Sequence, residues 1–248
     1  MRTVMITGAS SGIGLALAQH YADADFHVIA CGRNQASLDN IRQYSDNIET
    51  RCFDVTDKSA VETVSQSIDS IDILILNAGN CIYIEDPVNF NSEAFESIIQ
   101  TNLISLAYLL EYFMPKLVKP FTGKAEKPQL GFISSSATIV PFPKAQAYGA
   151  SKAGVDYLAR TMAIDLAKHN VDVTLVHPGF IKTPLTDKND FSMPFLLTVD
   201  QAADKILHGI AQRKSYVQFP KRLTVLLHAL ASLPSSWWQA LATRKLSS

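Results

Sequence analysis

The sequence has few charged residues, few cysteines and no long uninterrupted apolar run. Asp, Glu, Lys and Arg make up 18% of the 248 residues, below the roughly 25% of an average chain, which suits a fold with strands buried on both faces. Three cysteines cannot form a paired disulfide framework, so we expect reduced thiols in a cytoplasmic protein. No stretch reaches the roughly 18 apolar residues of a membrane span, and the N-terminus does not resemble a signal peptide.

Charge of one sign is also missing, which limits the classes of partner. The chain has 22 Lys and Arg against 23 Asp and Glu, so no overall field favours nucleic acid. The six histidines are scattered without the spacing of metal ligands, and we expect no metal site. Apolar residues reach 47%, which excludes disorder as the main state. These features indicate a cytosolic globular protein.

What the sequence does contain is a regular alternation of short apolar runs and amphipathic helical patterns. This alternation predicts an α/β fold in residues 1–219, a single-domain, doubly wound, Rossmann-type parallel sheet of about seven strands with helices on both faces. Between the strands, long helices are predicted over Ser92–Lys116 and Tyr148–His169, and a capping box at Thr198 opens another. The predicted strands are Thr3–Thr7, Phe26–Cys31, Ile48–Phe53, Ile71–Leu76, Leu130–Ser134, Val171–Val176 and Ser215–Phe219.

Glycines follow the first predicted strand directly. Gly8, Gly12 and Gly14 allow positive φ and let backbone N–H groups approach a ligand closely. The N-terminus of the next helix adds a partial positive charge, which favours a pyrophosphate. A Walker A loop is excluded because no Gly-Lys-Ser/Thr follows, and the spacing also departs from G-x-G-x-x-G. The turn is therefore either a phosphate cradle or a glycine-rich connection without a ligand.

Five motifs in order make the chain resemble the short-chain dehydrogenase/reductase family, from Arg2 to about Phe219. They are Thr7-Gly8-x-x-x-Gly12-x-Gly14, Asn77-Ala78-Gly79, Asn102 in the long helix, Ser135 before Tyr148-x-x-x-Lys152, and Pro178-Gly179 with Ile181 and Thr183. The resemblance implies an oxidoreductase that transfers hydride between nicotinamide and a carbonyl or secondary alcohol. The residues that it places at the cofactor are Gly8, Ser10, Ser11, Gly12, Ile13, Gly14, Asp54, Val55, Asn77, Ala78, Gly79, Tyr148, Lys152, Pro178, Gly179, Ile181 and Thr183.

The candidate catalytic residues have both a chemical and a structural interpretation. Tyr148 and Lys152 are four residues apart and share one helix face, where an ammonium is expected to lower the pKa of a phenol. The resemblance implies Tyr148 as general acid or base, Lys152 as a ribose ligand, Ser135 as the group that orients the substrate, and Asn102 as support for a proton-relaying water. Taken singly, each of these residues also fits an ordinary role at a helix surface or strand end. Their joint occurrence favours a catalytic site.

The end of the second predicted strand indicates which nicotinamide cofactor binds. A fold that prefers NAD usually has Asp or Glu about 20 residues after the glycines, where it binds the ribose 2′-hydroxyl. Here the strand ends in Cys31-Gly32-Arg33-Asn34, with no acid. The Arg33 guanidinium suits a 2′-phosphate, so we expect NADP, with NAD as the alternative. A solvated arginine in a connecting loop is the structural alternative for Arg33.

The substrate side is largely apolar. Phe191, Met193 and residues 194–197 follow Thr183, and residues 139–142 lie between Ser135 and Tyr148. An apolar carbonyl compound or alcohol is therefore expected, and the substrate itself is not fixed by the fold. The alternatives are an NAD-linked alcohol dehydrogenase of the same family and a non-catalytic nicotinamide-binding sensor or scaffold. The intact set of candidate catalytic residues argues against the last.

Residues 220–248 lie beyond the recognised motifs and form an apolar, helical C-terminal extension. Pro234 divides this segment, and Trp237-Trp238 begins its second half. One interpretation is a helical hairpin packed on the substrate cleft or a neighbouring subunit. The other is peripheral membrane contact, since paired tryptophans with flanking cations suit a membrane–water boundary. The family resemblance also implies a homodimer or homotetramer that pairs the long helices.

Overall fold

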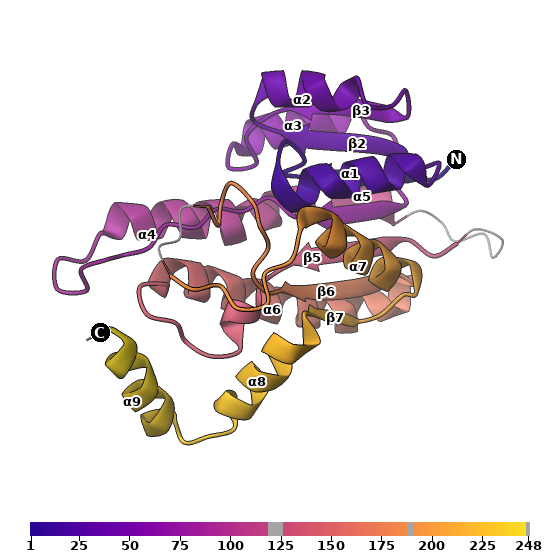
Figure 1. Ribbon diagram of the computed structural model, residues 1–248. Coiled ribbons are helices and arrows are strands. Elements are labelled where there is room, and N and C mark those ends of the chain that lie inside the picture. Colours follow the sequence, from indigo (N-terminus) through magenta and orange to yellow (C-terminus); the bar gives the residue numbers. More distant parts are fainter. Residues whose placement is uncertain (119–125, 188–190, 247–248) are drawn as a thin grey trace.

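The described chain folds around one parallel sheet. The computed structural model describes residues 1–118, 126–187 and 191–246. In them the strand order is β3-β2-β1-β4-β5-β6-β7, and all six neighbouring pairs are parallel (Figure 1). This confirms the predicted doubly wound, Rossmann-type fold. The strands are β1 (Thr3–Thr7), β2 (His27–Gly32), β3 (Ile48–Cys52), β4 (Ile73–Leu76), β5 (Gln129–Ile133), β6 (Asp172–Pro178) and β7 (Tyr216–Phe219).

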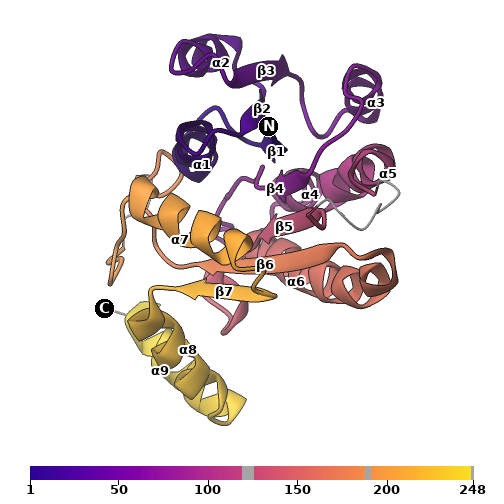
Figure 2. The same ribbon diagram turned by 90° about the vertical axis from the view of Figure 1, so that its right-hand side faces the viewer.

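Helices cover both faces of this sheet. Figure 2 shows α1, α2 and α7 on one face and α3, α5 and α6 on the other, and each layer encloses its own apolar core. The predicted capping box is present at Thr198, at the start of α7. The helices are α1 (Gly12–Asp23), α2 (Gln35–Arg42), α3 (Lys58–Gln66), α4 (Ser92–Ile99), α5 (Ser105–Leu117), α6 (Gln146–Leu166), α7 (Val199–Ala211), α8 (Lys221–Ala231) and α9 (Ser235–Leu246).

The helix predicted over Ser92–Lys116 is interrupted, which corrects the sequence-based expectation. A π-helical turn, Gln100–Ile104, separates α4 from α5. Such turns are rare and often occur at functional sites. Asn102 lies within it, only 1% exposed. The periodicity of apolar residues continues across this turn, so it did not indicate the interruption.

The order of the strands indicates where in the sheet a ligand would bind. The direction of winding reverses between β1 and β4, which are neighbours in the sheet but distant in sequence. In open parallel sheets, ligands bind beyond the carboxyl ends of the strands at such a switch point. The glycine turn after β1 and the Asn77-Ala78-Gly79 segment after β4 therefore meet at one edge of the sheet.

The C-terminal helices stand apart from the helical layers. Figure 1 shows α8 and α9 beyond β7, joined through Pro234 as an arm at the end of the sheet. The inner side of α8 packs Leu223 and Leu227 against Val140, in a small apolar cluster of its own. Residues 247–248 of the predicted extension lie outside the described part. Within the described ranges no helix is long and apolar enough to cross a membrane.

Candidate active site

The three glycines after β1 meet two different structural needs. Gly8 and Gly12 have φ of +68° and +56°, a conformation that side chains disfavour. Gly14 is needed for space, because a Cβ there would lie 2.2 Å from the Gly8 carbonyl oxygen and 2.5 Å from Nδ2 of Asn77. The turn is thus pressed closely against the loop after β4.

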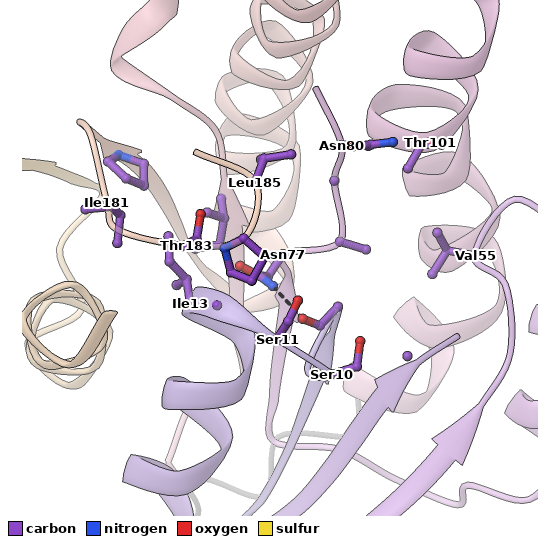
Figure 3. Close-up of a pocket in the computed structure, with 18 of the residues that line it drawn as sticks. Ser10, Ser11, Ile13, Val55, Asn77, Asn80, Thr101, Ile181, Thr183 and Leu185 are labelled. Atoms are coloured by element: carbon purple, nitrogen blue, oxygen red, sulfur yellow. Dashed lines mark hydrogen bonds between the residues drawn. The ribbon is translucent and has the colours of Figure 1, made fainter. Parts of the chain in front are cut away.

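Polar bonds fix this turn to the adjacent strand end. Asn77 Nδ2 donates to the Thr7 carbonyl at 2.9 Å, and the Asn77 backbone N–H donates to Thr7 Oγ1 at 3.0 Å. In Figure 3, Asn77 lies among Ser11, Ile13 and Thr183. Asn77 therefore has a clear structural role: it joins the glycine turn after β1 to the loop after β4.

A cavity of about 560 Å³ opens at this edge. It brings together nearly all residues that the sequence places at the cofactor. Gly14 lies behind the turn and does not line it, and Asn102 does not line it either. The predicted residues that do line it are Gly8, Ser10, Ser11, Gly12, Ile13, Arg33, Asp54, Val55, Asn77, Ala78, Gly79, Ser135, Tyr148, Lys152, Pro178, Gly179, Ile181 and Thr183.

The cavity also has lining residues that the sequence did not single out. Several adjoin predicted residues along the chain, so the same strand ends pointed to their position. Thr101 precedes Asn102, and Leu185 lies two residues after Thr183, but no motif named either residue (Figure 3). The lining residues missed by sequence reasoning are Gly32, Asn34, Phe53, Asn80, Thr101, Ile133, Ser134, Pro184, Leu185 and Thr186.

The turn fits a dinucleotide phosphate. α1 begins at Gly12, and its N-cap residue Ser11 makes no capping bond through its side chain. Because the first amides of a helix have no partner within the helix, they remain donors for an external acceptor. Two glycines and an open helix N-terminus together form an anion cradle.

Tyr148 and Ser135 meet at the inner part of the cavity. Their side chains are hydrogen-bonded, and Ser135 Oγ also accepts from the Ala137 backbone N–H at 3.1 Å. Burial raises the pKa of Tyr148 to about 12. The expectation of a lowered pKa is therefore wrong for this structure, because loss of solvation outweighs the favourable hydrogen bond from Ser135. Tyr148 stays protonated at neutral pH.

Lys152 lies one helical turn from Tyr148 and is buried. Its Nζ donates to the Ile133 carbonyl at 2.8 Å and lies 5.9 Å from the centre of the Tyr148 ring. Burial lowers the pKa of Lys152 to about 8, and the nearby Asp156 carboxylate opposes that shift. Two hydroxyl groups and an ammonium therefore line the same cavity as the glycine turn.

Comparison with known proteins decides the family. The family model described as short chain dehydrogenase matches residues 2–192. The chain belongs to the short-chain dehydrogenase/reductase family. It is an NAD(P)-dependent oxidoreductase.

Relatives and solved structures agree with this assignment. A fatty acyl-CoA reductase from Acinetobacter baylyi is 31% identical over 94% of this chain and 78% of its own length. A 3-oxoacyl-[acyl-carrier-protein] reductase from Thermotoga maritima is 32% identical over 75% of this chain and 77% of its own length. Among solved structures, a short-chain dehydrogenase from Sphingobium yanoikuyae in complex with NADPH is 26% identical, with a TM-score of 0.78, and covers 100% of this chain and 94% of that chain.

Asn102 is the residue of the family motif that lies in the long helix. Here its side chain joins the loop at Asn80 to Ser151 of α6, and we call this set of bonds the clamp. Its Nδ2 donates to the Asn80 carbonyl and to Ser151 Oγ, both at 2.9 Å, and its Oδ1 accepts from the Asn80 backbone N–H at 2.7 Å. A Cβ added at Gly79 would lie 3.3 Å from Asn102 Oδ1 and 3.5 Å from Lys152 Nζ. The clamp therefore fixes the loop that contacts Lys152, while support of a proton-relaying water stays a prediction.

A second polar network, which no motif indicated, lies behind Lys152 in this oxidoreductase. Asp156, one turn further along α6, accepts from Ser134 Oγ and bonds His177 Nε2 at 2.8 Å. His177 Nδ1 bonds the Tyr216 hydroxyl at 2.8 Å. The bonds from His177 and Ser134 hold the pKa of Asp156 below its usual value despite burial. Asp156 thus supplies a buried negative charge beside Lys152.

Asp156→Asn is expected to lower activity most at alkaline pH. Without the carboxylate, the pKa of Lys152 falls further, so its ammonium is lost at lower pH. The alkaline limb of the kcat/KM profile should move to lower pH, as measured from pH 5 to pH 10. Ser134→Ala is the matched control, since it removes one hydrogen bond and keeps the charge. An unmoved limb in Asp156→Asn would limit Asp156 to a structural role.

Proposed function

We propose that this enzyme reduces the carbonyl group of an apolar substrate to an alcohol with NADPH. The observation that carries the proposal is the convergence of Tyr148, Ser135 and Lys152 at one cavity, with Lys152 Nζ 5.9 Å from the centre of the Tyr148 ring. Burial raises the pKa of Tyr148, so its hydroxyl carries a proton at neutral pH. This state suits reduction, in which the carbonyl oxygen must gain a proton.

Tyr148, Ser135 and Lys152 each have a separate role in the proposed reduction. The cofactor, when bound, supplies hydride to the carbonyl carbon. Tyr148 donates its hydroxyl proton to the oxygen, and Ser135 donates a hydrogen bond to the same oxygen as negative charge develops. The Lys152 ammonium stabilises the tyrosinate that remains and holds the nicotinamide ribose.

The preference for NADP over NAD is supported by the end of β2. Ser10 lies there against Gly32, since a Cβ on Gly32 would be 3.0 Å from Ser10 Oγ. Arg33 follows, and its guanidinium makes one exposed ion pair with Asp54 at 3.2 Å, a contact worth little in solvent. Two of the structural neighbours were solved with NADP⁺ and NADPH, and others with NADH and NAD.

Arg33→Ala is expected to weaken NADPH binding by about tenfold or more and NADH binding much less, since a hydrogen bond to a charged group contributes about 1.5–3 kcal/mol. Titration of both cofactors by fluorescence measures the difference. Arg42→Ala, an exposed cation at the end of α2 outside the cavity, is the control. Equal losses for both cofactors in Arg33→Ala would assign Arg33 a structural role and favour the NAD-linked alternative.

The apolar character of the substrate is supported by aromatic and aliphatic side chains in the segment that follows the cavity-lining Gly179. Phe180 and Phe191 pack edge to face with ring centres 6.0 Å apart, and Phe195 and Leu196 are exposed nearby in the chain. Two relatives are named as reductases of fatty acyl-CoA and 3-oxoacyl-[acyl-carrier-protein]. A panel of carbonyl compounds assayed with NADPH and NADH, by loss of absorbance, tests the proposal. Cofactor binding without turnover of any member would favour the sensor or scaffold alternative.

The long helices support a homodimer or homotetramer as the assembly. α6 leaves Tyr157 and Ile164 78% and 76% exposed, seven residues apart on one face of the helix. Large apolar side chains that gather on one helix face mark a protein interface. Light scattering of the wild type and of Ile164→Glu tests this, and a monomeric wild type would contradict it.

The outer side of the C-terminal arm supports peripheral contact of a cytoplasmic enzyme with an anionic membrane surface. Val225, Leu226 and Trp237 are exposed there. Residues 220–248 contain four Lys or Arg and no Asp or Glu, and cations beside apolar side chains suit anionic lipid. Failure to co-sediment with anionic vesicles at low salt would contradict the membrane contact.

A further inference from the structure

The two adjacent tryptophans of α9 have different surroundings. The Trp238 indole N–H donates to the Pro141 carbonyl at 2.7 Å, and its ring packs edge to face on Phe142, with ring centres 5.9 Å apart. Trp237 is 62% exposed. Because its N–H is already bonded, Trp238 offers an apolar ring without an unpaired donor. Trp238 therefore contacts the loop between Ser135 and Tyr148, whereas Trp237 is mostly exposed.

The arm that carries Trp238 is fixed against the site at its other end. Leu223 and Leu227 of α8 are buried with Val140. A Cβ added at Gly179 would lie 2.8 Å from Leu223 Cδ2, so α8 rests directly on the turn that lines the cofactor cavity. The arm therefore bridges the two loops that flank the substrate end of the cavity.

Aromatic rings continue from this arm toward the reacting groups. Phe180 belongs to the same apolar cluster as Phe142 and Trp238. Phe180 packs on Phe191, and Phe191 packs on Tyr83, with ring centres 6.0 Å apart in both pairs. These rings come from three loops and one helix that are distant in sequence.

The inner end of this series reaches the catalytic tyrosine. The Tyr83 side chain is hydrogen-bonded to the Cys81 thiol. Cys81 follows Asn80, which lines the same cavity as Tyr148 and Lys152. The series therefore extends from the proton donor to α9, outside residues 2–192 that the family model covers.

We propose that the α8–α9 arm completes the substrate site, and that Trp238 binds the distal part of an extended apolar chain whose carbonyl group lies at Tyr148 and Ser135. This inference rests on the proposed function and names its substrate class, a long-chain aldehyde or ketone. Trp238 determines which chain lengths are used and takes no part in the proton or hydride transfer. Its contribution is burial of the methylene groups that lie furthest from the carbonyl.

The test is a series of straight-chain aldehydes from butanal to dodecanal, reduced with NADPH. In the wild type, kcat/KM is expected to rise by up to about fourfold for each methylene that becomes buried. Trp238→Ala should lose about tenfold or more on dodecanal, mainly through KM, and less than about twofold on butanal, which is too short to reach α9. Trp237→Ala is the matched control and should follow the wild type. Trp238→Phe should restore most of the dependence on chain length.

A binding measurement without turnover uses the fact that the chain has only two tryptophans. Trp237→Phe leaves Trp238 as the single tryptophan, and titration with dodecanol should shift its emission. Trp238→Phe leaves only Trp237, whose emission should not change. An unchanged emission in Trp237→Phe would place the bound chain away from α9 and overturn the inference.

The outcomes separate this inference from the proposed function. A wild type that reduces no aldehyde, or reduces butanal and dodecanal equally well, contradicts the proposed apolar substrate. If kcat/KM of the wild type rises with the chain length of the aldehyde as expected, and Trp238→Ala shows the same rise, only the role of the arm is overturned. If Trp238→Ala loses kcat/KM equally on butanal and dodecanal and has a lower Tm, Trp238 merely stabilises the fold. That result would also overturn the inference.

Discussion

Tyr148→Phe is expected to lower kcat by about 10²–10⁴-fold, the usual contribution of general acid catalysis. The hydroxyl is the proposed proton donor next to Ser135, whereas the ring and the backbone of α6 should pack as before. Affinity for the cofactor should change little, because the remaining cavity is intact. The measurement is steady-state reduction of a good substrate, with cofactor titration on the same preparations.

Tyr157→Phe is the control for this substitution. Tyr157 lies on the same helix and does not line the cavity, so loss of its hydroxyl alone should leave the rate unchanged. If Tyr148→Phe kept more than about a tenth of the wild-type rate, another group would be the proton donor. A large loss of cofactor affinity instead would point to a disturbed cavity.

Gly14→Ala is expected to abolish measurable cofactor binding and to destabilise the fold. The added Cβ would meet the Gly8 carbonyl oxygen at 2.2 Å and its carbonyl carbon at 2.8 Å. Backbone atoms cannot rotate away as a flexible side chain does, so the phosphate-binding turn must move. Overpacking typically costs about 1–3 kcal/mol and occasionally more. Thermal unfolding and NADPH titration measure the two effects.

Gly149→Ala provides the opposite result as a control. Gly149 lies inside α6, and a Cβ there would have no neighbour within 4 Å. Alanine in a helix interior is favoured over glycine by about 0.5–1 kcal/mol, so Tm should rise and the cofactor should still bind. If Gly14→Ala bound NADPH like the wild type, the turn would not be the phosphate cradle proposed here.

Much of the fold and of the candidate site was predictable because the deciding features are local. Alternating apolar runs and helical periodicity depend only on neighbours along the chain, and they indicated the parallel sheet of about seven strands. The spacing between Tyr148 and Lys152 places both on one helix face whatever surrounds the helix. The glycines after β1 likewise indicated a close backbone approach before any contact was known.

Tertiary structure decided what depends on atoms distant in sequence. The π turn at Gln100–Ile104 and the network of Asp156, His177 and Tyr216 arise where α5, α6, β6 and β7 meet, and no periodic pattern encodes such a meeting. The pKa of Tyr148 was expected to fall and instead rises, because its value depends on how completely the folded protein removes water.

Trp237 and Trp238 show what the sequence determined and what only the tertiary structure decided. The sequence by itself predicted an apolar, helical segment over residues 220–248, with flanking cations and a division at Pro234. It presented Trp237 and Trp238 as equivalent, because adjacent residues share the same composition and local propensity. Only the packing of α9 on the loop after Ser135 distinguished them, since adjacent helical residues point about 100° apart and just one of them meets Phe142.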